Sequence, residues 1–151
     1  MKLIDEIVEA RNFWEAWMSV RRNHGAAGMD NMAVEELDVY LPAHMDEVKS
    51  SMLEKRYKPS PVRRVYIPKP NGKQRPLGIP TVIDRVVQQA AAQVLSKVYE
   101  PIFSDSSYGF RPNRSCHMAI WKALDYLNDG YEWVIDFDIE KYFDTVNHDK
   151  L

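Results

Sequence analysis

Apolar residues recur at helical spacing near the start of the chain, with charged residues between them. This pattern predicts an amphipathic helix over residues 3–22. The positions expected to face a core are Ile4, Ile7, Val8, Phe13, Trp14 and Trp17. Two glycines within 24–31 then break the pattern and indicate a loop. A second helix is predicted over 34–56, with Pro42 as a candidate interruption because proline removes a helical hydrogen bond.

The pattern changes to that of β-structure over residues 62–80, where short runs of β-prone residues flank Asn71 and Gly72. An Asn-Gly dipeptide between such runs is a strong signal for a hairpin turn. Pro68 and Pro70 lengthen the turn beyond two residues and keep this end of the strands out of a sheet centre. The sequence therefore predicts a β-hairpin in this region.

Two further helices carry recognisable start signals. Thr81 and Asp84 have the spacing of a capping box at the start of a helix predicted over 82–99. Ser115 is a suitable N-cap for the last long helix, which is predicted over 115–129 and ended by a glycine.

Side chains alternate along residues 131–139, which predicts a β-strand with one packing face and one acidic face. The acidic face would carry Asp136 and Asp138. Carboxylates two residues apart on a strand repel each other unless a cation, a base or water compensates them. Two explanations remain open: an exposed edge strand with solvated acids, or oxygen ligands for Mg²⁺ at the end of a buried strand.

The composition is that of a folded domain. With 151 residues, 45% of them apolar, the chain is long enough to bury a core. The first residues lack the basic start and apolar run of a secretory signal. No run approaches the roughly eighteen apolar residues that a membrane helix needs. The single cysteine, Cys116, excludes an internal disulfide and fits a reducing compartment.

Charge is distributed unevenly, although the whole chain carries a net charge of −2. Residues 55–85 hold nine basic side chains against Asp84 alone, whereas residues 1–54 and 86–151 are both net acidic. A compact basic block is the electrostatic signature of a phosphate-binding surface. The alternative is a solvated basic face, which charge alone does not exclude.

Several common catalytic motifs are absent from the sequence. The segment NGKQRP at 71–76 lacks the preceding glycine and the following Ser or Thr of a P-loop. Cys116 and His117 are helix neighbours that do not face each other, so a buried thiol is favoured over a nucleophile pair. The other histidines lack metal-ligand spacing.

Three blocks of the sequence, in their order and spacing, resemble successive blocks of group II intron-encoded reverse transcriptases, the intron maturases of bacteria and organelles. They are VRRVYIPKPNGKQRPLGIPTVIDRVVQQA at 62–90, SYGFRPNRSCHMAI at 107–120 and VIDFDIEKYFDTVNHDKL at 134–151. The segment GMDNMAVEEL at 28–37 also resembles the block that precedes the fingers in that family. The resemblance covers residues 25–151.

The resemblance implies an α+β fold: the fingers subdomain of a right-hand polymerase, with helices and an antiparallel β-hairpin, joined to the first palm strand. Residues 1–27 would form an N-terminal helix and loop. Residues 28–130 would form the fingers region, and residues 131–151 would begin the palm. The implied activity is RNA-directed DNA polymerisation.

The resemblance also implies roles for individual residues. Asp138 matches the first metal-binding aspartate of the palm, with the backbone carbonyl of Ile139 beside it. Phe143 matches the aromatic residue that lies under the incoming sugar and discriminates against a 2′-hydroxyl. Lys69 and Arg75 match finger residues that contact the triphosphate of the incoming dNTP.

A second set of residues is implicated in template binding. Arg111 and Pro112 belong to the segment YGFRP, which matches the family's segment near the templating base. Arg63 and Arg64 are candidate RNA-binding residues of the basic hairpin.

Two Mg²⁺ ions would bridge the attacking 3′-oxygen and the α-phosphate, while the finger cations neutralise the leaving pyrophosphate. The implied partners are an intron RNA template, a DNA primer and dNTP, in the bacterial cytoplasm or an organelle.

One departure from the family's pattern is the lack of a second catalytic aspartate pair, because no Asp-Asp dipeptide occurs in the sequence. The chain is therefore expected to be a fragment that is inactive alone and binds Mg²⁺ weakly or not at all. One alternative is a noncatalytic module that binds structured intron RNA, and a weaker one is a metal-dependent nuclease. An uncovered strand at 131–139 would also promote a homodimer or higher oligomers.

Overall fold

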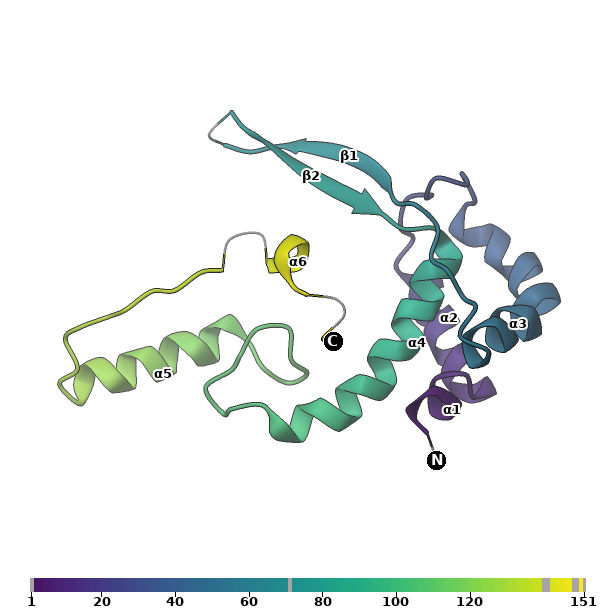
Figure 1. The fold of residues 1–151 in the computed structure, drawn as a ribbon. Coiled ribbons are helices and arrows are strands. Elements are labelled where there is room, and N and C mark those ends of the chain that lie inside the picture. The colour runs from purple at the N-terminus through teal and green to yellow at the C-terminus, as the bar shows by residue number, and fades with distance from the viewer. Residues whose placement is uncertain (1, 71, 140–141, 148–149, 151) are drawn as a thin grey trace. The chain divides into compact units, whose positions relative to one another are not determined.

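The chain folds into two units, Met1–Ile102 and Phe103–Leu151. The first contains the helices α1 to α4 and the hairpin, and the second contains α5 and α6 (Figure 1). The computed structural model describes residues 2–70, 72–139, 142–147 and 150, without the side chains of Phe143 and Asp144.

Two helices form where the sequence predicts one. α1 spans Leu3–Ile7 and α2 spans Ala10–Arg22. The side-chain amide of Asn12 donates to the carbonyl oxygen of Ile7 at 2.9 Å and to that of Ala90 at 3.0 Å. The last carbonyls of a helix have no partner within the helix. Asn12 therefore satisfies the end of α1 and ties it to a distant part of the chain.

The next predicted helix begins as a 3-10 turn, η1 (Val34–Glu36), and continues as α3 over Leu37–Leu53. Pro42 lies inside α3 without ending it. Proline removes one hydrogen bond of the helix, but Leu41 before it is buried in the core and Val48 after it packs against that core. Packing on both sides of the proline explains why the helix continues.

α4 spans Val82–Tyr99, which confirms the prediction from its capping signal. The hydroxyl of Thr81 accepts a hydrogen bond from the backbone N–H of Asp84 at 3.2 Å, as an N-cap should. A 3-10 turn, η2 (Glu100–Ile102), follows the helix.

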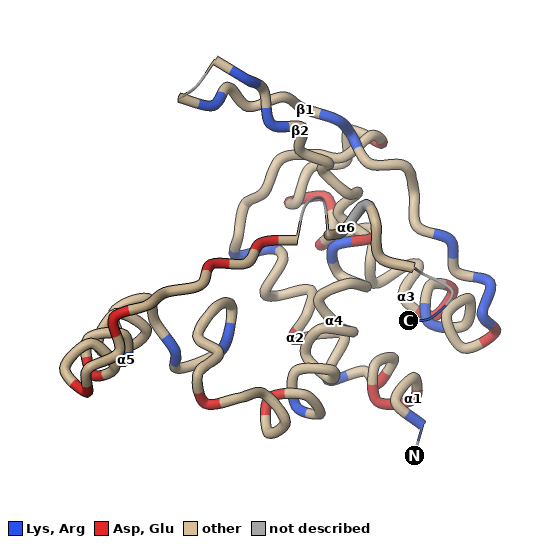
Figure 2. Tube along the Cα trace, turned by 60° about the vertical axis from the view of Figure 1, so that its left-hand side comes forward, with Lys and Arg blue, Asp and Glu red and all other residues tan. Residues whose placement is uncertain are grey.

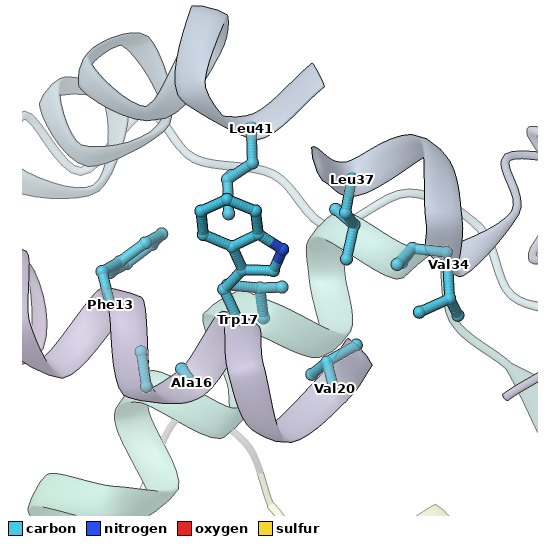
Figure 3. Close-up of a cluster of buried hydrophobic side chains, with 10 residues drawn as sticks. Phe13, Ala16, Trp17, Val20, Val34, Leu37 and Leu41 are labelled. Atoms are coloured by element: carbon cyan, nitrogen blue, oxygen red, sulfur yellow. The ribbon is translucent and has the colours of Figure 1, made fainter. Parts of the chain in front are cut away.

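The helices α2, α3 and α4 share one apolar core with η1. Figure 3 shows side chains of α2 beneath those of η1 and α3. Apolar residues three or four positions apart form a single stripe on α2, and burying this stripe stabilises the unit. The buried residues of the core are Phe13, Ala16, Trp17, Val20, Val34, Leu37, Leu41, Val82, Val86 and Ala90.

β1 (Arg63–Pro68) and β2 (Gln74–Ile79) form the predicted antiparallel hairpin. At its turn, the N–H of Lys69 donates to the carbonyl oxygen of Lys73 at 2.7 Å. Gly72 has a φ of 77°, a conformation that glycine adopts without steric cost. Figure 1 shows the hairpin extending away from the helices of its unit.

The second unit contains α5 over Cys116–Asn128 and the short helix α6 over Tyr142–Thr145. The hydroxyl of Ser115 accepts from the N–H of Met118 at 3.4 Å, which confirms the predicted N-cap. No helix in the described part of the chain is both long enough and apolar enough to cross a membrane.

The prediction of a strand over residues 131–139 is wrong. These residues adopt no regular secondary structure, and β1 and β2 are the only strands among the described residues. A strand needs a neighbour to satisfy its backbone hydrogen bonds, and none pairs with this segment. The α+β class is confirmed by the helices and the two-stranded sheet, but the first palm strand is not formed.

Truncating Leu41 should reveal the contribution of core packing within α3. Leu41 is 0% exposed, whereas Val39 in the same helix is 80% exposed. Leu41→Ala is expected to lower the free energy of unfolding by about 2–5 kcal/mol, because it leaves a cavity. Val39→Ala should change it by less than about 0.5 kcal/mol. Chemical denaturation measures both values, and equal losses would contradict this orientation of α3.

Candidate nucleic-acid interface

The basic block of the sequence forms an exposed surface on the hairpin. Four of its side chains, the hairpin cations Arg63, Arg64, Lys69 and Arg75, are all exposed. Figure 2 shows Lys and Arg residues on both strands. Residues 55–83 contain no Asp or Glu, so no acidic neighbour in the sequence reduces this charge.

The strand register divides the hairpin cations between two faces. Arg63 is paired with Ile79, and Arg75 is paired with Ile67. Paired residues point to the same side of a sheet, and successive residues alternate between sides. Arg63 and Arg75 therefore share one face, and Arg64 lies on the other. Both faces present positive charge.

The ion pairs among the described residues are formed by cations other than the hairpin cations. Examples are the pairs of Arg11 with Glu15 and of Arg21 with Asp38. None of the ion pairs in the described part of the chain includes a hairpin cation, so this charge is available to an anionic ligand. Arginine offers a planar fork of donors and lysine a compact charge, and both recognise phosphate.

A buried carboxylate lies where the hairpin joins α4. Asp84 is 3% exposed, and its Oδ1 accepts a hydrogen bond from the Tyr57 hydroxyl at 2.5 Å. Its Oδ2 accepts from the Ser60 N–H at 3.1 Å and from the Thr81 hydroxyl at 2.6 Å. Burial raises the pKa of the Tyr57 phenol, and the hydrogen bond to Asp84 and the charge of that carboxylate raise it further. Tyr57 therefore stays protonated and remains a donor at physiological pH.

The loop before α5 is held in shape by arginines. Nη1 of Arg111 donates to the carbonyl oxygens of Ser104 at 2.7 Å and Ser107 at 2.9 Å. Arg114 donates to the backbone carbonyl and to the carboxylate of Asp105, both at 3.1 Å. The guanidinium of Arg111, which the sequence implicates in template binding, is thus engaged within its own loop.

Two neighbours of Arg111 face solvent instead. Phe110 is fully exposed and has a φ of 55°, which is uncommon for a residue with a side chain of this size. Pro112, the other residue implicated near the templating base, is also exposed. The loop therefore presents an aromatic ring and a proline at its surface.

The expected metal ligands belong to the exposed segment 131–139. Asp138 is exposed there and Ile139 is 66% exposed. In the part of the chain that the structure describes, no group of three or more His, Cys, Asp or Glu residues is arranged to hold a metal ion. Asp138 and a carbonyl supply two of the roughly six oxygen ligands of Mg²⁺, so they do not form a site by themselves. The side chain of Phe143 lies outside the described residues.

Removing the Arg111 guanidinium should loosen the loop. Arg111→Ala loses two hydrogen bonds to backbone carbonyls, and a net cost of about 1 kcal/mol corresponds to roughly fivefold faster local opening. We expect this acceleration at the Ser107 N–H, which donates to the Ser104 carbonyl at 3.0 Å. Hydrogen exchange by NMR measures it, with the exposed His117→Ala as control. Unchanged exchange at Ser107 would contradict the bracing role.

A comparison with protein families finds one that matches more than half of this chain. The family described as reverse transcriptase (RNA-dependent DNA polymerase) matches residues 67–151. The matched range includes part of the hairpin, all of α4, the loop before α5 and the 131–139 segment.

Similar proteins occur in bacteria and yeast. Protein YkfC of Escherichia coli (strain K12) is 44% identical over 125 residues, covering 80% of this chain and 33% of that protein. Group II intron-encoded protein LtrA of Lactococcus lactis subsp. cremoris is 37% identical over 137 residues, covering 90% and 22%. Putative COX1/OXI3 intron 2 protein of Saccharomyces cerevisiae is 31% identical over 153 residues, covering 100% and 17%.

This chain spans a third or less of the length of these relatives. Two of the relatives are named after introns, and the family match covers Lys69, Arg75 and the later blocks but begins after Arg63 and Arg64. The chain therefore belongs to the reverse transcriptase family, in its group II intron-encoded branch.

Proposed function

We propose that this chain holds the RNA template and the incoming dNTP of a group II intron reverse transcriptase. The observation that carries this proposal is the exposed, acid-free hairpin, whose cations lie on both faces. A polyanion gains affinity on such a surface because binding releases the counterions condensed on its phosphates. The fold presents this charge outside the apolar core, where a long ligand can reach it.

Two of the hairpin cations would bind dNTP, and the other two would bind the RNA template. Lys69 at the turn and Arg75 on β2 bind the triphosphate of dNTP. Lysine supplies a compact positive charge there, and arginine supplies a planar fork of donors. Arg63 and Arg64 hold the phosphate backbone of the template. Their opposite orientations support contacts with phosphates on either side of the hairpin.

The second unit would contribute to the template and to the reaction centre. Pro112 and the loop braced by Arg111 lie near the templating base, and Phe143 excludes the 2′-hydroxyl of a ribonucleotide. Asp138 and the Ile139 carbonyl bind Mg²⁺ together with carboxylates from other segments, and Mg²⁺ supplies charge stabilisation at the reacting phosphate. Because the sequence contains no Asp-Asp pair to supply those further carboxylates, we expect the 151-residue chain alone not to extend a DNA primer.

A noncatalytic module that binds intron RNA is the second candidate function. It is favoured by the same exposed cations, and it needs no metal site.

Self-association through the 131–139 segment also stays a prediction, supported by the exposure of Trp133 and Phe137 at 93% and 86%. The relatives come from bacteria and yeast, which is compatible with a bacterial cytoplasm or an organelle.

Neutralising the hairpin cations should weaken RNA binding and flatten its salt dependence. Each phosphate of a single-stranded RNA that a cation neutralises adds about 0.7 to the steepness of log affinity against log salt. Losing the two template-binding cations should therefore reduce the steepness by about 1.4, and by up to about 3 where Lys69 and Arg75 also contact RNA in the absence of dNTP. We expect this change when all four hairpin cations are replaced by Gln. Fluorescence anisotropy with a labelled single-stranded RNA at several salt concentrations measures affinity and slope.

A matched control removes four exposed cations elsewhere in the first unit. In this control Lys2, Arg11, Arg22 and Lys97 are replaced by Gln, which gives the same net charge. The control should keep most of the affinity and the slope of the unmodified chain. Equal losses in both variants would show that overall charge determines RNA binding, and the proposed hairpin site would be wrong.

Replacing Phe143 should relax the choice of sugar in a reverse transcriptase that contains this chain and the remaining palm. Phe143→Ala opens space at the 2′ position, so the preference for dNTP over rNTP in kcat/KM should fall by about tenfold or more. Phe137→Ala, in the exposed segment before it, should keep the preference, and Asp138→Ala should abolish synthesis. Primer extension with each nucleotide measures these effects. An unchanged preference in Phe143→Ala would exclude the sugar-selecting role.

A further inference from the structure

The hairpin has few packing contacts along its strands. Every described residue of β1 and β2 is exposed except Val65 and Ile79, which are partly buried. A two-stranded hairpin is only marginally stable by itself, and Figure 1 shows this one extending away from α4. Contacts at its base must therefore set its direction.

Asp84 connects the segments on both sides of the hairpin to α4. Tyr57 and Ser60, which precede β1, donate to the two different oxygens of the carboxylate. Thr81, which follows β2, donates its hydroxyl proton to Oδ2 and accepts the N–H of Asp84 with the same oxygen. One side chain thus closes the hairpin at its base and fastens it to the first turn of the helix.

The charge of Asp84 is compensated by hydrogen bonds. Among the described residues Asp84 forms no ion pair with a Lys, Arg or His side chain, and it lies in the first turn of α4, where the helix dipole favours an anion. A neutral amide at this position would place an N–H group against at least one of the surrounding donors. The observed set of three donors is therefore matched by a carboxylate, whereas an amide would require at least one of the hydroxyls to turn and accept a hydrogen bond.

The loop at 24–31 packs closely against the same junction. A Cβ on Gly28 would lie 2.6 Å from the Cα of Thr81 and 2.9 Å from the carbonyl oxygen of Pro80. Such backbone contact leaves Thr81 little room to move. Pro80 and Thr81, which follow β2, are therefore confined both by this loop and by the Asp84 carboxylate.

We infer that Asp84 is a positioning residue, which fixes the direction of the hairpin and so the location of the hairpin cations. Six residues of strand extend about 20 Å, so a rotation of about 10° at the base moves the tip by roughly 3 Å. A displacement of about 1 Å can cost a reacting site a hundredfold in rate. The consequence for RNA and dNTP rests on the proposed function, whereas the direction of the hairpin can be measured without either ligand.

Distances between two spin labels test this inference on the whole chain. Nitroxides are attached to Gln74→Cys on β2 and Ser50→Cys on α3, both exposed positions, in a Cys116→Ser background. The unmodified junction should give one narrow distance distribution by pulsed EPR. Asp84→Asn and Tyr57→Phe should each broaden or shift it, by about 3 Å for Asp84→Asn if the hairpin turns by the angle above.

Tyr40→Phe provides a matched control. Tyr40 lines the same cavity of ≈ 290 Å³ as Tyr57 and Asp84, and its hydroxyl does not bond to Asp84. This variant should leave the distribution unchanged, and an equal broadening would overturn the inference. If circular dichroism shows that Asp84→Asn has lost its helices, Tyr57→Phe decides alone. An unchanged distribution in Tyr57→Phe and in a folded Asp84→Asn would also overturn the positioning role.

RNA binding separates this inference from the function on which it rests. Because ordering a loosened hairpin costs free energy on binding, folded Asp84→Asn should bind RNA about three- to tenfold more weakly. Its salt slope should remain that of the unmodified chain, since no cation has been removed. Failure of the unmodified chain to bind RNA would refute the proposed function and leave the spin-label distances to decide the role of Asp84.

Discussion

The packing of α2 and α3 against α4 is the interaction on which the rest of the first unit depends. It buries the apolar stripe of α2, and polar bonds at its margin fix how the helices are aligned. Asn12 donates to the Ala90 carbonyl, and Gln93 donates to Oδ1 of Asn12 at 2.8 Å. Apolar contact is nondirectional, whereas these bonds have a defined geometry. They therefore specify one alignment, which places the first turn of α4 beneath the hairpin.

Elements with a local signal could be predicted from the sequence. The N-caps at Thr81 and Ser115 and the Asn-Gly turn each act within a few residues, and the corresponding helices and hairpin formed as predicted. The break between α1 and α2 could not be predicted, because it depends on a bond from Asn12 to a residue 78 positions away. The prediction of a strand over 131–139 was wrong for a related reason. Alternation of side chains indicates the two faces of a strand, but it does not show whether a neighbouring strand is present to pair with it.

The candidate site was predictable to a similar extent. The lack of acids in residues 55–83 indicated exposed positive charge, and the hairpin cations are exposed. The internal bonds of Arg111 depend on how its loop folds, which the motif YGFRP does not reveal. Asp84 was recognised only as part of a helix cap. A sequence signal was available, because it is the only acid among residues 55–85, and a lone acid in a basic block suggests a specific partner.

The absence of acids from the hairpin has a consequence for the protein without RNA. Lys69 and Lys73 are joined across the turn by a backbone hydrogen bond, so their like charges repel one another within a small element. Dissolved salt screens this internal repulsion as well as the attraction to phosphate. Higher ionic strength therefore stabilises the hairpin in the absence of RNA, while it lowers the affinity of the hairpin for a polyanion. The ligand replaces the screening ions, so part of the energy of binding comes from relief of strain among the protein's own charges.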